Sequence, residues 1–242
     1  MKLIEFFPPD APCSYLEGYR SSFRYFYIEE CSEYFYQGLL ERGYRRFGLH
    51  FFVPICKGCN ACKTIRQDVA KFSPTKSHKR VLQKNMHIRV EIKKPTLTQE
   101  KLLLYDKYHK NMQIKKGWNY QGVSTDYYNE TFILGSLNFG YEFDYYLEDR
   151  LIGVGFTDIL KDSISAIYFF YDHDFQKQSL GVFNILMQLY FAKQKQIKYF
   201  YPGYWIPNHR SLGYKSQFMP FEILYNTPDL FEALDYRIFQ GV

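Results

Sequence analysis

The chain has 242 residues and a formal net charge of +6, and 20% of its residues are aromatic. It contains no run of eighteen apolar residues, so no transmembrane helix is predicted, and an acid and two prolines near the start disfavour a signal peptide. Its five cysteines are an odd number, which argues against a disulfide framework. We therefore expect a cytoplasmic protein with one large domain or two small ones.

The first half of the chain is expected to alternate short strands with helices. Extended runs predict strands at residues 24–30, 45–54, 64–70 and 90–95. Helical patterns with polar caps predict helices at residues 32–43, 77–85, 96–116 and 125–135. The first of these helices begins at Ser32 and stops at Gly43, and the second is a basic helix or turn.

The second half begins with three extended runs. They are separated by charged turns and predict an antiparallel meander over residues 142–148, 151–160 and 163–171. An amphipathic helix, two strands and a terminal helix are then expected at residues 180–195, 197–201, 221–225 and 228–236.

Three strands, a helix and a further strand, with a glycine turn before the helix, are typical of acyltransferases of the GNAT type. We therefore predict an α/β (α+β) protein with two parts. Residues 95–242 form a GNAT-like acyltransferase domain, and residues 1–94 form an N-terminal cysteine-containing basic subdomain.

The glycine turn over residues 176–181 resembles the loop that holds coenzyme A pyrophosphate in GNAT enzymes. Backbone N–H groups of Ser179 and Gly181 are candidates for binding a phosphate at the start of the helix. Because Ser179 replaces the first glycine of that pattern, coenzyme A is disfavoured as the ligand, and the turn binds a different phosphate or none.

Three of the cysteines lie at CxxCxxC spacing. With one more from the N-terminal segment they would supply the four ligands of a zinc ion, and an iron–sulfur cluster would use the same set, Cys13, Cys56, Cys59 and Cys62. The alternative is that they are ordinary reduced thiols. A metal here would be structural or redox-sensing and is not required for the chemistry.

Residues 56–94 carry eleven Lys and Arg residues against two acids, so the positive charge is local. Lys79 and Arg80 belong to a cluster on one short element that suits the phosphates of a nucleic acid. The alternative is a solvated cationic face.

Ten segments of the chain, in order, resemble one known family. They include CSYL, GYRR, CKGCNAC, SAIYFFYD and YPGYWI, and they occupy residues 13–16, 43–46, 56–62, 72–77, 79–81, 104–109, 165–172, 179–181, 201–206 and 214–215. The chain resembles the arginyl-tRNA–protein transferase family and, within it, the bacterial aspartate/glutamate leucyltransferases. The CxxCxxC run and the short length favour this bacterial type.

The resemblance implies a reaction. An aminoacyl-tRNA donates its amino acid, leucine in the bacterial type and arginine in the longer eukaryotic relatives, to proteins that begin with Asp or Glu. The added residue marks the acceptor for degradation. The partners would therefore be a charged tRNA and acidic protein N-termini, with no membrane.

This transfer needs an aligned amine, a proton acceptor and oxyanion stabilisation. Asp172 is a candidate for orienting or deprotonating the amine, and Tyr168 and Tyr201 for hydrogen bonds to the oxyanion or ribose. Turn capping by Asp172 and packing of the tyrosines are the alternatives. His109 is interpreted as a packing residue.

The substrates need further contacts. An arginine would bind the acidic side chain of the acceptor, and the candidates are Arg20, Arg66 and Arg80. The terminal adenine would stack on Tyr204 or Trp205, and Lys215 would neutralise a phosphate near the 3′ end. Two rival functions stay open: an acetyl-coenzyme A N-acetyltransferase and a non-catalytic zinc-containing RNA-binding module.

Overall fold

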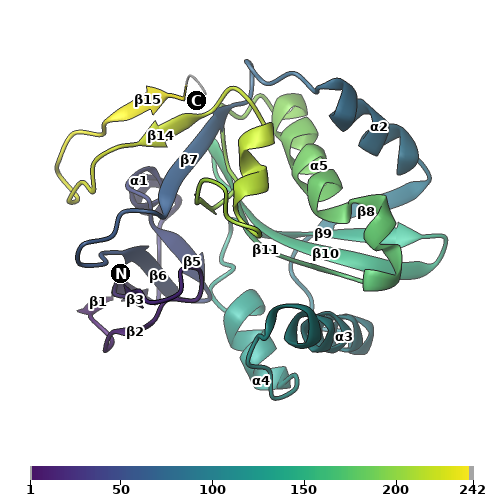
Figure 1. Ribbon diagram of the computed structural model, residues 1–242, viewed down its shortest axis with the longest axis horizontal. Helices are drawn as coiled ribbons and strands as arrows, with labels where there is room; N and C mark the ends of the chain where they lie inside the picture. Colours follow the sequence, from purple (N-terminus) through teal and green to yellow (C-terminus); the bar gives the residue numbers. More distant parts are fainter. Residues whose placement is uncertain (1, 240–242) are drawn as a thin grey trace.

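The computed structural model describes residues 2–239, which form a mixed α/β structure with two main β-sheets (Figure 1). The larger sheet contains nine strands, and one of them, β13 (Tyr204–Trp205), pairs only with β7. The other eight are, in spatial order, β15 (Tyr236–Ile238), β14 (Glu222–Leu224), β7 (Lys63–Asp68), β12 (Tyr199–Tyr201), β11 (Ser163–Tyr171), β10 (Arg150–Ile159), β9 (Gly140–Leu147) and β8 (Ile88–Lys93).

The smaller sheet is antiparallel, and one of its faces is covered by α1 (Glu33–Glu41), whose N-cap is Ser32 as predicted. Its strands, in spatial order, are β1 (Leu3–Phe6), β4 (Phe23–Ile28), β6 (His50–Pro54) and β5 (Arg45–Phe47). A separate two-stranded ribbon joins β2 (Ala11–Pro12) to β3 (Arg20–Ser21).

The single strand predicted over 45–54 is a hairpin, β5 and β6. Gly48 has a positive φ of 55°, and a Cβ at this position would collide with the carbonyl oxygen of Glu130. A residue with a side chain would not fit here, and glycine therefore allows the tight turn that joins β5 to β6.

Strands β11 and β12 are parallel and separate after a short contact. Their register pairs Ser163, Ile164 and Ser165 with the three residues of β12. Beyond Ser165, β11 continues to Tyr171 beside β10 alone, whereas the chain after β12 turns at Gly203 to pair with β7. We call the region between these diverging arms the strand fork.

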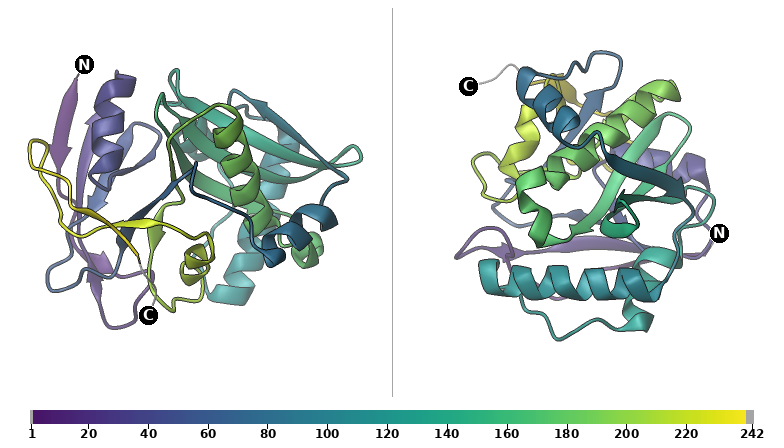
Figure 2. Two further views of the ribbon diagram at one scale, coloured as in Figure 1. Left: turned by 90° about the horizontal axis from the view of Figure 1, so that it is seen from above. Right: turned by 90° about the vertical axis from the view of Figure 1, so that its right-hand side faces the viewer.

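Helices cover both faces of the larger sheet (Figures 1 and 2). On one face, Ile185 and Leu189 of α5 (Leu180–Gln194) pack against Phe200, and α2 (Lys76–Lys84) lies against α5. On the other face, Leu102 and Tyr105 pack against the sheet from α3 (Gln99–Lys116), next to α4 (Thr125–Tyr128) and η1 (Asn129–Ile133). No helix of the described region is long and apolar enough to span a bilayer.

A buried ion pair links the two sheets. The Arg46 Nε on β5 donates to the Asp158 Oδ2 on β10 at 2.8 Å, and the Tyr36 hydroxyl of α1 donates to the same oxygen at 2.8 Å. The Arg46 Nη1 also donates to the carbonyl oxygens of Gly48 at 2.8 Å and Gly135 at 2.9 Å. The Asp158 carboxylate therefore joins β10 of the larger sheet to both β5 and α1.

The terminal helix predicted over 228–236 is wrong. This segment is a loop that leads into β15, which pairs with β14. Two arginines hold the loop at Asp229: the Arg24 Nη1 donates to its carboxylate at 2.7 Å, and the Arg42 Nε donates to its carbonyl oxygen at 2.9 Å. These long-range contacts, and the pairing that they allow along the edge of β14, outweigh the local helical pattern.

The boundary predicted at residues 94 and 95 does not coincide with a break between sheets. Strands β7 and β8 both precede it, yet β7 lies in the middle of the larger sheet and β8 at its end. Their partners, β12 and β9, come from the second half of the chain.

Candidate active site

Tyr168, predicted as a catalytic residue, forms a hydrogen-bonded pair with His109 in the strand fork. The His109 Nδ1 lies 2.8 Å from the Tyr105 carbonyl oxygen, and its Nε2 lies 2.8 Å from the Tyr168 hydroxyl. A carbonyl oxygen only accepts, so Nδ1 carries the hydrogen and Nε2 accepts from Tyr168. Burial lowers the pKa of His109 and raises the pKa of Tyr168, so both are neutral near pH 7. His109 is buried with both ring nitrogens hydrogen-bonded, as expected of a packing residue, and one of its partners is a predicted catalytic residue.

Aromatic rings surround this pair. The ring of Phe47 on β5 is 6.2 Å from that of Tyr168, and the ring of Tyr120 stacks on His109 at 5.1 Å. Towards the end of β11, the ring of His173 stacks on Tyr171 at 5.0 Å. Such walls keep bulk water from the His–Tyr hydrogen bond, which strengthens it.

The other arm of the fork contains two buried cations. The guanidinium of Arg45 lies over the rings of Tyr204 at 5.1 Å and Tyr201 at 5.7 Å. The Lys215 Nζ donates to the Tyr204 carbonyl oxygen at 2.7 Å. Burial and the nearby charge of Arg45 lower the pKa of Lys215 to about 7. Tyr201, Tyr204 and Lys215, all predicted site residues, are therefore neighbours.

Asp172 lies at the end of β11 and is held by cations. Its carboxylate pairs with Lys107 at 2.6 Å and with Arg150, and the backbone N–H of Asp174 donates to it at 3.0 Å at the start of η2 (His173–Gln178). Burial raises the pKa of Asp172, but the hydrogen bonds from Lys107 and Asp174 outweigh this effect and lower it overall. A carboxylate of lowered pKa is a weak base, so this environment suits turn capping, and the predicted catalytic role stays a prediction.

Replacing Asp172 with Asn is expected to lower the free energy of unfolding by about 1–3 kcal/mol at pH 7, because charge-assisted hydrogen bonds are lost while the cap remains. The lowered pKa means that this stabilisation is present above the ordinary value of about 3.9 and disappears as the pH falls through the folded-state value. Denaturant titrations at pH 7 and below pH 4 check both expectations.

The matched control for that experiment is Asp174→Asn, since Asp174 pairs with the same Lys107 at 2.6 Å but is largely exposed. It should change the unfolding free energy by less than about 1 kcal/mol. If Asp172→Asn instead leaves stability intact and lowers only kcat, Asp172 acts in the reaction.

Ser179 and Gly181 lie at the N-terminus of α5, where they were predicted to bind a phosphate. Ser179 has a φ of 54° and its side chain makes no cap hydrogen bond, and the position of a Cβ on Gly181 faces open space. The preceding turn is held by α2, since the Lys84 Nζ donates to the Lys177 carbonyl oxygen at 2.6 Å. Lys79 and Arg80 are exposed on the same α2.

The basic stretch over 56–94 does not form one continuous surface. The cysteine loop lies near one end of the larger sheet, and α2 lies near the other end, beside α5 (Figures 1 and 2). The cysteine loop precedes strand β7 and α2 follows it, so the length of this strand separates the two regions.

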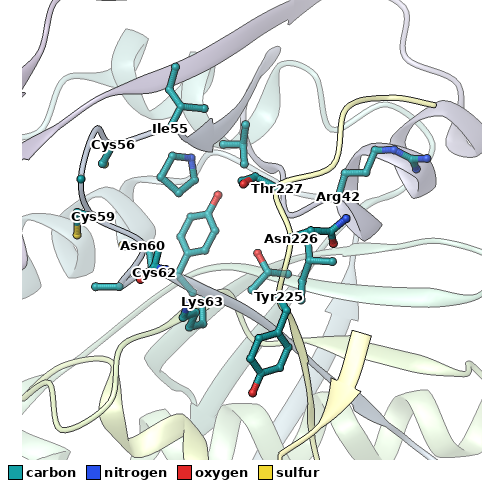
Figure 3. A pocket seen from close by; sticks show the side chains of 17 residues that line it. Arg42, Ile55, Cys56, Cys59, Asn60, Cys62, Lys63, Tyr225, Asn226 and Thr227 are labelled. Carbon is teal, nitrogen blue, oxygen red and sulfur yellow. The ribbon is translucent and has the colours of Figure 1, made fainter. Parts of the chain in front are cut away.

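The cysteine loop forms one wall of a pocket of about 570 Å³, and residues 225–227 form the facing wall (Figure 3). Cys62 interacts electrostatically with Cys13, Cys56 and Cys59, and burial raises the pKa of its thiol to about 12. All four thiols are free. Within residues 2–239, however, no three His, Cys, Asp or Glu side chains are arranged to hold a metal ion, so no chemical step is assigned to one.

The candidates for the acceptor's acidic side chain are occupied or exposed. The Arg66 Nε donates to Glu222 at 2.7 Å, and its guanidinium lies between the rings of Tyr199 and Tyr236. Arg20 is exposed and donates to the Asp10 carbonyl oxygen. Arg80 is exposed on α2, which lies on the opposite side of the larger sheet from α3, the helix that contains His109 (Figure 1).

Trp205 is placed in a core, where base stacking is blocked. Its indole is 6% exposed and packs against Phe221 at 5.4 Å and Phe239 at 5.3 Å. Its Nε1 donates to the Gly213 carbonyl oxygen at 3.3 Å. Of the two residues predicted to stack on the terminal adenine, Tyr204 is the one that lies against Arg45 in the fork.

Sequence reasoning missed two residues of the fork, Arg45 and His109. Both lie inside segments that carry the family resemblance, GYRR and LYDKYH, so their positions were visible but their roles were not. Nothing in the local sequence shows that Arg46 forms an ion pair with an acidic side chain whereas Arg45, within the described chain, does not.

Two family models match the chain. The arginine-tRNA-protein transferase N-terminal model matches residues 11–80, and the corresponding C-terminal model matches residues 100–225. A protein of Helicobacter hepaticus named aspartate/glutamate leucyltransferase is 47% identical over 241 residues, which cover 100% of both chains. A protein of Campylobacter jejuni with the same name is 44% identical over 91% of this chain and 92% of its own.

Among solved structures, the crystal structure of FemX superposes with a TM-score of 0.50 at 9% identity, covering 82% of this chain and 68% of FemX. At that identity the likeness concerns the fold alone.

Proposed function

Because this chain belongs to the arginine-tRNA-protein transferase family, we propose that it transfers leucine from leucyl-tRNA to the α-amino group of proteins that begin with Asp or Glu. The observation that carries the proposal is the 47% identity, over the full length of both chains, to a protein named aspartate/glutamate leucyltransferase. The added leucine would mark the acceptor for degradation. The reaction belongs in the cytoplasm, where charged tRNA is available.

We assign residues 95–242 to a GNAT-like arrangement with the cysteine-containing segment in front of it. Two features support this. The first is the antiparallel meander β9–β10–β11, and the second is the parallel strand β12, which follows α5 in the chain and pairs with only the start of β11. The turn at Ser179 and Gly181 would then bind a phosphate of the tRNA 3′ end, and Lys79 and Arg80 would contact its acceptor stem.

The Tyr168–His109 pair supplies the proton transfer. The neutral α-amine attacks the ester carbonyl carbon of the aminoacyl-tRNA and forms the new C–N bond. The amine proton passes to the Tyr168 oxygen as the phenolic proton moves to the His109 Nε2. The same path then returns a proton to the ribose oxygen as the ester C–O bond breaks. The Tyr168–His109 pair therefore returns to its starting protonation state at the end of the reaction.

The remaining predicted residues position the substrates. The Tyr201 hydroxyl accepts from the Arg66 Nη1 at 3.4 Å, and its predicted hydrogen bond to the oxyanion or ribose stays a prediction. Tyr204 and Lys215 lie beside it and would contact the terminal adenosine and the acceptor.

A donor comparison tests the assignment. The protein is incubated with leucyl-tRNA or arginyl-tRNA, each charged with a labelled amino acid, and a peptide that begins with Asp. We expect label in the peptide from leucyl-tRNA, and none when the peptide is N-acetylated. Label from arginyl-tRNA alone would favour arginine as donor. No transfer from either, with a thermal shift on adding acetyl-coenzyme A, would favour the N-acetyltransferase.

We also propose that Cys13, Cys56, Cys59 and Cys62 close around a structural zinc ion or iron–sulfur cluster. The electrostatic coupling of Cys62 to the other three supports this, although the thiols would have to draw together. Metal content and absorbance of the purified protein, compared with Cys62→Ser, test it; a metal-free wild type would contradict it.

A further inference from the structure

The described residues contain four buried Lys and Arg side chains: Arg45, Arg46, Lys101 and Lys215. Two of them have built-in counterions, since Arg46 pairs with Asp158 and Lys101 pairs with Glu142. Within residues 2–239, no acidic side chain forms an ion pair with Arg45 or Lys215. An arginine keeps its charge when it is buried, so the lack of a counterion at Arg45 is costly and indicates that an anion comes from outside the chain. The same anion would restore the full charge of Lys215, whose pKa is lowered to about 7 without it.

The unpaired edge of Arg45 has the shape that binds a carboxylate. Its Nη1 donates to the Tyr44 carbonyl oxygen at 2.8 Å, while the buried Nε and Nη2 have no hydrogen-bond partner. The rings of Tyr201 and Tyr204 hold the guanidinium through its faces. Parallel N–H donors on one guanidinium edge match the two oxygens of a carboxylate.

Strand β5 places the free edge of Arg45 on the side of the strand that faces the Tyr168–His109 pair. Side chains two residues apart on a strand share a face, so Arg45 and Phe47 point to the same side of β5. Phe47 contacts Tyr168 on one arm of the fork, and Arg45 contacts Tyr201 and Tyr204 on the other arm. A ligand of Arg45 is therefore on the side of β5 that faces the Tyr168–His109 pair.

We propose that Arg45 receives the side-chain carboxylate of the acceptor's N-terminal Asp or Glu, with Lys215 as the second cation beside it. This inference rests on the proposed function, which supplies the acceptor. Arg45 is only 5% exposed and lies over the rings of Tyr204 and Tyr201, so a ligand can approach its free edge only with a narrow end, such as a side-chain carboxylate. A tRNA phosphate continues into backbone on both sides and requires an open groove.

The first test replaces Arg45 with methionine, which keeps much of the volume and removes the charge. The value of kcat/KM for a peptide beginning with Asp is expected to fall about 100-fold, mainly through KM, as when one partner of a buried charge pair is removed. The wild type should prefer this peptide strongly over one beginning with Asn, and Arg45→Met should lose the preference.

Stability separates this role from a structural one. Removing a buried charge that has no counterion should leave the melting temperature of Arg45→Met unchanged or raise it. Arg45→Lys keeps the positive charge but cannot form a bidentate pair with a carboxylate. Its preference for the Asp peptide should lie between that of Arg45→Met and that of the wild type. The control is Arg237→Met, which changes an exposed guanidinium and should leave both peptides unaffected.

Calorimetric binding of the two peptides without tRNA, together with tRNA binding by filter retention, completes the experiment. Retention of the wild-type Asp preference by Arg45→Met overturns the proposal, as does loss of tRNA binding with unchanged peptide binding. If the wild type transfers from neither donor yet binds the Asp peptide through Arg45, the proposed function fails and the assignment of Arg45 stands.

Discussion

Replacing Tyr168 with phenylalanine is expected to lower kcat for leucine transfer about 10²–10³-fold, with the KM for peptide and tRNA little changed. The change removes the hydroxyl that lies 2.8 Å from the His109 Nε2, and with it the path of the proton, while the ring and its packing remain. Single-turnover transfer from leucyl-tRNA to a peptide beginning with Asp measures this loss directly.

The pH profile adds a second expectation for the same pair. Burial lowers the pKa of His109 below its ordinary value of about 6.5, and the ring accepts a proton only when it is neutral. Activity should first fall as the acceptor's α-amine becomes protonated below about pH 8, and fall more steeply as the pH drops through the lowered value of His109. His109→Gln should remove only this lower step. Tyr34→Phe, which changes a phenol that is 90% exposed, is the control. A full rate in Tyr168→Phe would exclude the proton path.

Replacing Asp158 with alanine is expected to lower the free energy of unfolding by about 3–5 kcal/mol. The substitution leaves the buried Arg46 without its counterion and the Tyr36 hydroxyl without its acceptor. Since this junction holds the smaller sheet and α1 against the larger sheet, the loss should appear as a lower midpoint in urea, followed by circular dichroism.

Asp235→Ala is the matched control, because Asp235 also pairs with an arginine, Arg237 at 2.6 Å, but does so at the surface. Because that pair is exposed to solvent, its loss should lower stability much less than the loss of Asp158. Equal losses in the two variants would show that burial of the Arg46–Asp158 pair adds nothing to its effect.

Elements with strong local signals were predicted correctly. The N-cap at Ser32, the three strands from 140 to 171 and the helix after Ser179 all appear in the structure. Capping hydrogen bonds and strand turns act over a few residues, so the chain carries them in its local order. The segment 228–236 failed because its partners, Arg24 and Arg42, lie about two hundred residues away.

The site shows the same division. The segments that carry the resemblance indicated the reaction and the candidates Tyr168, Tyr201, Lys215 and Asp172, but they did not show that the Asp172 carboxylate is held by Lys107 and Arg150. A residue's chemistry depends on its charged neighbours, and those come from other strands.

Motifs and caps are local patterns, so the amino-acid sequence was enough to predict the family, the reaction that the family implies, and the order of most helices and strands. Which ionisable groups are paired depends on contacts between distant parts of the chain, and these appear only in the fold. Arg45 and Arg46 are adjacent in the sequence, yet alternation along β5 turns Arg46 towards Asp158 and Arg45 towards the fork. That difference of one residue separates a charge that stabilises the fold from one that is left for the substrate.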